Sequence, residues 1–222
     1  MVKAANRTEY FQSSETPLPT HITSLESFQS IPSTPIEKYR ALRLPATLTD
    51  PSDIEWVVGP HLGHSPQNIA YAEDSDAAQT RNDLYQRVFT NSISTQKNPS
   101  AIVIGTHQKR YFGAEIASIL VRLGTPAHLF VDMKLSRIEQ ILQTLEPSIV
   151  VVLDDQVIEE LIPTSVELCI TVRQSHTFKK HSQIDLYHVD ELGFMGYSTD
   201  SETYRLHHDE YHFEQNESGR LI

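Results

Sequence analysis

Four short apolar runs in the middle of the chain constrain its fold more than any other feature. The runs occupy residues 101–105, 127–131, 148–153 and 166–172, and segments with helical spacing separate them. None of the runs alternates between apolar and polar residues, so each is expected to be buried on both faces, as the strands of a parallel sheet are. The sequence therefore predicts an α/β protein, with a mostly parallel sheet, right-handed crossovers and flanking helices.

Apolar residues recur at helical intervals around these predicted strands. The predicted helices cover residues 75–97, 111–124, 135–147 and 155–162. Gly124 stands where one helix would end, and Ser136 with Glu139 has the spacing of a capping box at the start of the next helix. The buried face predicted for residues 135–147 consists of Leu135, Ile138, Ile141, Leu142 and Leu145.

The two ends of the chain differ from this α/β core, which we place at residues 61–183. Prolines interrupt residues 1–60 and exclude long helices there, so we expect an irregular N-terminal arm with short helices at 22–29 and 36–42. Residues 184–222 have the pattern of short strands broken by turns. They predict a C-terminal β-rich, antiparallel segment packed on the same domain.

The composition excludes several classes of function. The 222 residues include 18 Lys and Arg against 29 Asp and Glu, a formal charge of −11. Such a chain lacks the basic surface that nucleic acids and anionic membranes require, so we expect no nucleic acid and no membrane as a partner. No apolar run approaches the roughly 20 residues of a membrane span. A single cysteine, Cys169, and the lack of a signal-peptide pattern predict a cytoplasmic protein.

An aromatic and acidic segment at the end of a predicted strand is the first candidate site. In residues 187–191, Tyr-His-Val-Asp-Glu, the tyrosine can stack on a flat ring, and the two carboxylates are ligands that Mg²⁺ accepts together with phosphate oxygens. The alternative interpretation is a solvated acidic turn. Residues 105–113 also lie between a strand and a helix, but their spacing matches neither phosphate-binding fingerprint, so Gly113 is expected to serve helix packing.

A cluster of histidines and carboxylates near the C-terminus is the second candidate. It consists of His207, His208, Asp209, Glu210, His212 and Glu214. Imidazole and carboxylate groups bind zinc and similar ions, and on a strand His208 and His212 would share one face. The spacing matches no zinc motif, and the alternative is a polar surface strand. Cys169, inside an apolar run, is expected to be a buried structural residue rather than a nucleophile.

Five stretches, taken in order, carry a family resemblance. They are ITSLESFQSIPSTPIEKYR (22–40), YFGAEIASILVRLGTPA (111–127), LSRIEQILQTLEPSIVVV (135–152), YHVDELGFMGYS (187–198) and YRLHHDEYHFEQNESGRLI (204–222). The fourth stretch resembles an aromatic-Gly-x-Thr-Glu motif, and the fifth resembles a segment of the form LH-x-x-E-x-x-x-x-E. Together they resemble the adenylate-forming enzymes, in particular the branch of phenylacetate–coenzyme A ligase and the acyl-protein synthetases.

The resemblance implies ATP or AMP and Mg²⁺ as cofactors, and a small carboxylate or nucleotide as ligand. Carried over by position, Tyr187 matches the aromatic residue that lies against adenine, and Glu191 matches the glutamate that helps to bind Mg²⁺ and phosphate. Asp190 stands where the family has a threonine that touches the α-phosphate, and His188 replaces a glycine. The cofactor-binding residues that the resemblance implies are therefore Tyr187, His188, Asp190 and Glu191.

This chain departs from the family pattern in several places, and these departures change the function that we expect. The family's phosphate loop falls near residues 57–67, where this chain has two glycines, one serine and no lysine. The family's later ribose-binding aspartate and its C-terminal domain with a lysine have no match. We therefore expect a truncated, degenerate relative that acts as a binding, accessory or partner-interaction protein and is inactive as an isolated ligase. Its partner would be another protein or a second copy of the chain.

Two other functions stay open at this point. The first is an ATP-dependent carboxylate–CoA or acyl-protein ligase that a second chain or subunit completes. The second is a metal-dependent enzyme that uses the histidines and carboxylates of residues 207–214.

Overall fold

The computed structural model describes most of residues 71–211, which include the α/β part of the chain. The described residues are 56–58, 71–73, 75–94, 98–172, 178–189, 193–200 and 203–211, with Ser24, Ile31 and Phe213. The short helices predicted at 22–29 and 36–42 lie outside them. No helix in these described ranges is both long and apolar enough to cross a membrane.

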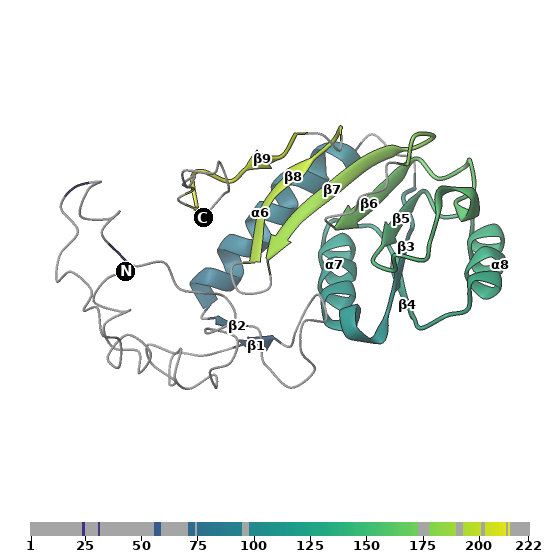
Figure 1. Cartoon of the computed structure of the whole chain (residues 1–222), viewed down its shortest axis with the longest axis horizontal. Helices are drawn as coiled ribbons and strands as arrows, with labels where there is room; N and C mark the ends of the chain where they lie inside the picture. Colours follow the sequence, from purple (N-terminus) through teal and green to yellow (C-terminus); the bar gives the residue numbers. More distant parts are fainter. Residues whose placement is uncertain are drawn as a thin grey trace.

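A seven-stranded, mostly parallel sheet forms the centre of the described structure (Figure 1). Its first five strands in spatial order, β4, β3, β5, β6 and β7, run parallel, and β8 and β9 follow antiparallel. The strands are β3 (Ala101–Gly105), β4 (Ala127–Val131), β5 (Ile149–Val152), β6 (Leu168–Val172), β7 (Ser182–Val189), β8 (Gly193–Ser198) and β9 (Arg205–Leu206). The α/β fold class, the parallel sheet and the antiparallel C-terminal part predicted from sequence are therefore confirmed. A separate two-stranded antiparallel sheet joins β1 (Trp56–Val58) and β2 (Tyr71–Glu73).

Helices cover both faces of the parallel part. On one face lie α6 (Ser75–Ile93) and α7 (Arg110–Arg122), and Figure 1 shows α6 running along β7 and β8. On the other face lies α8 (Leu135–Leu145). A 3-10 turn, η2 (His107–Lys109), precedes α7. The three long helices were predicted because each has a continuous apolar stripe.

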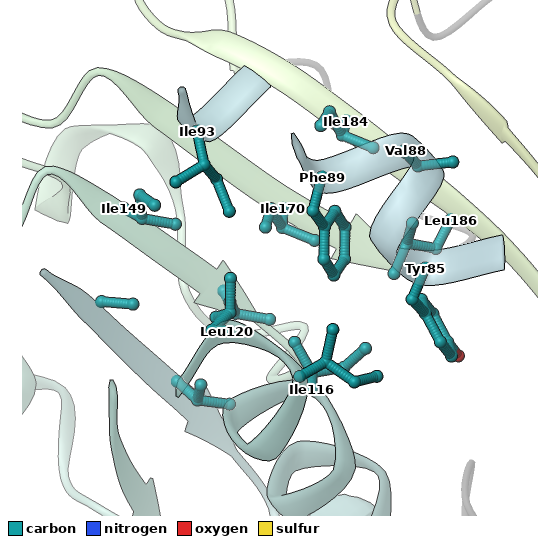
Figure 2. Packing of buried hydrophobic residues seen from close by; sticks show 14 of the residues in the cluster. Tyr85, Val88, Phe89, Ile93, Ile116, Leu120, Ile149, Ile170, Ile184 and Leu186 are labelled. Atoms are coloured by element: carbon teal, nitrogen blue, oxygen red, sulfur yellow. The ribbon is translucent and has the colours of Figure 1, made fainter. Parts of the chain in front are cut away.

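The core between the sheet and α6 and α7 contains mostly large apolar side chains (Figure 2). From α6, Tyr85 and Phe89 point toward the strands, and the Tyr85 ring stacks on that of Phe194 in β8 at 4.4 Å and 2°. From α7, Ile116 and Leu120 fill the space between the helices and the sheet. This cluster extends to Ile184 and Leu186, so it anchors one face of β7.

The core on the α8 side is smaller. Ile138 and Leu142 of α8 pack against alternate residues of β3, β5 and β6, and Cys169 belongs to this cluster. The described residues that follow on this face, Thr171 in β6 and Gln183 and Asp185 in β7, are polar and buried. One face of β7 is thus apolar and the other polar.

Two local predictions are wrong. The helix predicted at 155–162 is only a 3-10 turn, η3 (Glu159–Leu161). The Asp154 carboxylate accepts a hydrogen bond from the Gln156 N–H at 3.0 Å, and this side-chain bond favours a turn over a helix. The predicted capping box is also absent, because α8 begins one residue before Ser136, with Lys134 as its N-cap and no side-chain capping bond. Gly124, with a φ of 82°, ends α7 as predicted.

Candidate functional site

Tyr187 lies near the carboxyl end of β7, the last parallel strand of the sheet. Its side chain is half-buried, and the residues on either side of it in the strand are the buried Leu186 and His188. Because successive side chains of a strand point to opposite faces, Tyr187 shares a face with Asp185 and not with the apolar core. The position matches the general rule that ligands bind at the carboxyl ends of strands in open α/β sheets.

A β-bulge follows Tyr187. Tyr187 pairs with Gly196 of β8, but His188 pairs with Phe194, so Met195 is an extra residue on β8. His188 is fully buried, and its ring lies 4.7 Å from the ring of Phe112 in α7. The structure therefore places His188 in the core on the α7 side, on the face opposite Tyr187, and its role in a cofactor site stays a prediction. A buried ring at this position serves packing.

A chain of buried polar side chains lies on the same face as Tyr187. Gln183 accepts a hydrogen bond from the Phe178 N–H at 2.9 Å and donates one to the Thr171 hydroxyl at 3.1 Å. Thr171 in turn donates to Oδ1 of Asp185 at 2.5 Å, and the Tyr204 hydroxyl donates to Oδ2. Asp185 is only 1% exposed, and a buried carboxylate requires hydrogen bonds of this kind.

Tyr204 extends this chain to Tyr187. Their ring centroids lie 5.4 Å apart with an interplanar angle of 51°. Tyr204 is half-buried and comes just before β9. Neither Asp185 nor Tyr204 was among the residues predicted for the site, although the alternation of Gln183, Asp185 and Tyr187 along one strand marks a polar face there.

Polar groups in the connection between β3 and α7 bond to residues that follow β4 and β5. The Asp132 carboxylate accepts a bond from the His107 N–H at 2.7 Å, and the Lys109 ammonium lies 3.2 Å from an Asp155 oxygen. Gly113 is buried, and an added Cβ would lie 2.9 Å from a methyl of Leu129. This contact fits the packing role expected of Gly113.

The predicted strand that was to carry the C-terminal histidines ends at Leu206. A turn covers residues 208–210, with the Glu210 and Tyr211 N–H groups bonded to the His207 carbonyl at 3.1 and 2.9 Å. His208 is exposed and lies 5.2 Å from the Phe213 ring, whereas His207 is 6% exposed. Within the part of the chain that the structure describes, no three His, Cys, Asp or Glu residues are grouped to hold a metal.

Four residues of the predicted sites lie outside the described residues. They are Asp190, Glu191, His212 and Glu214. The Mg²⁺ role of Glu191 and the metal role of His208 and His212 therefore stay predictions.

Cys169 is fully buried in β6. Burial, together with the nearby Glu159 carboxylate, raises the pKa of its thiol to about 12. A thiol with this pKa holds almost no thiolate at neutral pH, so Cys169 has a structural role.

A cavity of about 350 Å³ opens at the other end of β6 and β7. Ser92, Glu167, Ser182 and Thr199 line it, together with Gln183. It lies at the amino ends of these strands, away from Tyr187.

Comparisons with known proteins give similarities of structure alone. No family model matches the chain, and no curated protein matches it. Two structures of the amide bond synthetase McbA from Marinactinospora thermotolerans, one of them a mutant, are 13% and 12% identical, with TM-scores of 0.47 and 0.46, over 68% of this chain and 35% of theirs. The luciferase-like enzyme from the nonluminescent Zophobas morio mealworm is 13% identical, with a TM-score of 0.40, over 59% of this chain and 33% of its own. The chain thus spans about a third of the length of these structures, and the likeness is one of fold.

Proposed function

We propose that this chain binds an adenine nucleotide at the carboxyl end of β7, with the Tyr187 ring against the base. The observation that carries the proposal is the placement of Tyr187. It is a half-buried aromatic residue at the end of the last parallel strand, and its ring lies on the polar face while its neighbours are buried in the core. A flat base can stack on such a ring, and ligands of open α/β sheets bind at this edge.

The sequence resemblance supports a nucleotide as the ligand. Tyr187 stands at the aromatic position of the motif that lies against adenine in adenylate-forming enzymes, and the other stretches of the resemblance follow in the same order. Asp190 and Glu191 come directly after β7, where carboxylates suit Mg²⁺ bound together with phosphate oxygens. The finer relationship, to phenylacetate–coenzyme A ligases and acyl-protein synthetases, is part of the same proposal.

We propose binding rather than ligation as the activity of this chain. Adenylation concentrates negative charge on the α-phosphate, which backbone N–H groups, Mg²⁺ and a cation must stabilise. Residues 57–67 contain no lysine, and Asp190 replaces a neutral hydroxyl with a carboxylate. In this proposal the chain is a cytoplasmic binding or accessory protein that works with a protein partner or with a second copy of itself.

Calorimetric titration of the full chain with AMP, and with ATP in the presence of Mg²⁺, tests the proposal. Tyr187→Ala should weaken binding by roughly 5- to 150-fold, because base–aromatic stacking contributes about 1–3 kcal/mol. Tyr187→Phe, which keeps the ring, is the matched control and should bind like the unchanged chain. Absence of nucleotide binding by the unchanged chain, or equal binding by Tyr187→Ala, would contradict the proposal.

ATP–pyrophosphate exchange separates binding from ligation. We expect the isolated chain to show no exchange with a panel of aromatic and fatty acids. Robust exchange would contradict the proposal that the chain binds a nucleotide without activating an acid, and would favour a carboxylate-activating ligase.

A further inference from the structure

We infer that Asp185 and Tyr204 are positioning residues that fix the ring of Tyr187 in the orientation in which it meets a base. The inference rests on the proposed function for the identity of the ligand. It concerns two residues to which neither the sequence patterns nor the family resemblance assigned a role.

The strand arrangement brings Tyr204 beside Tyr187. β8 lies between β7 and β9, and its Gly196 pairs with Tyr187 on one side and with Leu206 on the other. An added Cβ at Gly196 would lie 2.5 Å from the Arg205 carbonyl oxygen, so glycine is what allows β9 to approach this closely. Gly196 adds no side chain between the rings of Tyr187 and Tyr204, which lie 5.4 Å apart.

The buried polar chain restricts the position of Tyr204. Each hydrogen of the chain has a defined direction: Gln183 donates to the Thr171 oxygen, and the Thr171 hydroxyl therefore directs its only proton to Asp185. The second oxygen of Asp185 accepts the Tyr204 hydroxyl. At 1% exposure, Asp185 has little access to water, so loss of the Tyr204 hydroxyl would leave a carboxylate oxygen with one donor fewer.

A fixed Tyr187 ring would stack on a base with a smaller loss of side-chain entropy than a freely rotating ring. A half-buried tyrosine at a strand end can rotate about its side-chain bonds, and binding would then have to immobilise it at an entropic cost. The 51° contact with Tyr204 blocks part of that rotation before the ligand arrives. The two residues act on the ligand through Tyr187, and the shared bond predicts that they act as one unit.

Two measurements on the full chain test this inference. The first is AMP affinity by calorimetry for Tyr204→Phe, Asp185→Asn and the double variant. Each single change should weaken binding about fivefold, since a hydrogen bond to a charged group contributes at least that much, and the double variant should be no weaker than the singles. Tyr197→Phe is the matched control, because Tyr197 lies on the adjacent strand and packs against the apolar core on the other face.

The second measurement is ¹⁹F NMR of protein labelled with 3-fluorotyrosine, in which Tyr187→Phe assigns the Tyr187 signal. Tyr204→Phe retains both rings, so a change in the shift or width of the Tyr187 signal reports a changed ring position rather than loss of a neighbour. We expect such a change for Tyr204→Phe and none for Tyr197→Phe. Tyr204→Phe removes one oxygen from a half-buried side chain, so it remains informative if Asp185→Asn does not fold.

The outcomes separate the inference from the proposed function. If the unchanged chain binds AMP but Tyr204→Phe alters neither the affinity nor the Tyr187 signal, the inference is overturned. If the unchanged chain binds no AMP while Tyr204→Phe still changes the Tyr187 signal, the positioning role stands and the proposed ligand is wrong. No AMP binding and no change in the signal would overturn both.

Discussion

At the scale of single residues, His207 is the titratable group whose setting has the clearest consequence. Its ring lies edge-on to Phe194 at 4.8 Å and is 6.2 Å from the Tyr197 ring. Nε2 has no hydrogen-bond partner among the described residues. Burial lowers the pKa of His207; the nearby Asp209 carboxylate opposes this shift and the Arg87 guanidinium adds to it, both with smaller effects.

This lowered pKa predicts that the protein loses stability as the pH falls through 6.5, the ordinary value for histidine. Below that pH the unfolded chain binds a proton that the folded chain resists, so protonation favours unfolding. Urea unfolding between about pH 5 and about pH 8 measures the effect. His207→Phe should flatten the dependence on pH, whereas His208→Phe, at an exposed position, should not.

Equal pH profiles for the unchanged chain and His207→Phe would show that His207 does not set the dependence. Arg87 and Asp209, which form an exposed ion pair of 2.6 Å beside it, would then be the next groups to replace.

Residues of the candidate site differ in how far the sequence could predict them. Tyr187 was predictable, because an aromatic residue at the end of an apolar strand is visible in a short window. The contact between Asp185 and Tyr204 was not, because it depends on the pairing of three strands and on a glycine that allows close approach. The core position of His188 follows from the same alternation, because His188 comes two residues after the buried Leu186 in β7.

At the scale of elements, α8 shows where periodicity is reliable and where it is not. Its stripe predicted five buried residues, but only Ile138 and Leu142 are fully buried, while Ile141 is partly exposed and Leu135 and Leu145 are exposed. A helix that covers a sheet buries a narrow stripe, and a sequence pattern does not reveal the width of the contact.

We expect Leu142→Ala to destabilise the protein by about 2–5 kcal/mol, because it leaves a cavity beneath α8. Ile141→Ala, one residue away, is the matched control and should cost clearly less. Chemical denaturation of both variants measures the difference. Equal losses for the two variants would mean that α8 is rotated relative to the structure described here.

The glycines of two elements give a second contrast. At Gly196 an added Cβ would meet the backbone at Arg205, which cannot move without breaking the β8–β9 pairing, whereas at Gly113 it would meet the flexible end of Leu129. We therefore expect Gly196→Ala to release β9 and to make the chain near residue 205 sensitive to limited proteolysis. Gly113→Ala should leave the proteolytic pattern unchanged, and cleavage near residue 205 in neither variant would contradict the expectation.

The strands were predictable and the connections were not, for a physical reason. β3, β5 and β6 are short, continuous apolar runs, and burial on both faces leaves few other structures for such a run. The run 127–131 also forms a strand, β4, but the prediction that it is buried on both faces is wrong, because β4 lies at the edge of the sheet and its residues are partly or fully exposed. The segment after β5 has equally helical spacing, but Asp154 bonds to the backbone of Gln156 and forms a turn. Local side-chain bonds of this kind decide connections, and periodicity does not report them.

At the scale of the whole molecule, the strands of the sheet differ in how far they are buried. Helices cover both faces of β3 and β5, and their side chains are fully buried. β9 consists of only two residues and is partly exposed, and among the described strands it pairs with β8 alone. Local stability should follow this gradient.

Hydrogen–deuterium exchange would measure the local stability of each strand. We expect the slowest amide exchange in β3, β5 and β6 and fast exchange in β9, and nucleotide binding at Tyr187 should slow exchange in β7 and β8 first. Protection in β9 equal to that in β5 would show that the C-terminal strand is part of the cooperative core.

The extra residue in β8 limits which changes of length this fold can accept. Because Met195 sits outside the regular pairing, Phe194 reaches the α6 side and stacks on Tyr85. Deleting Met195 would restore regular pairing and leave Phe194 opposite His188 with its ring on the same face, whereas pairing Met195 itself with His188 would turn that ring to the opposite face, at the expense of the stack. An engineer who shortens this strand should therefore remove Met195 and keep Phe194.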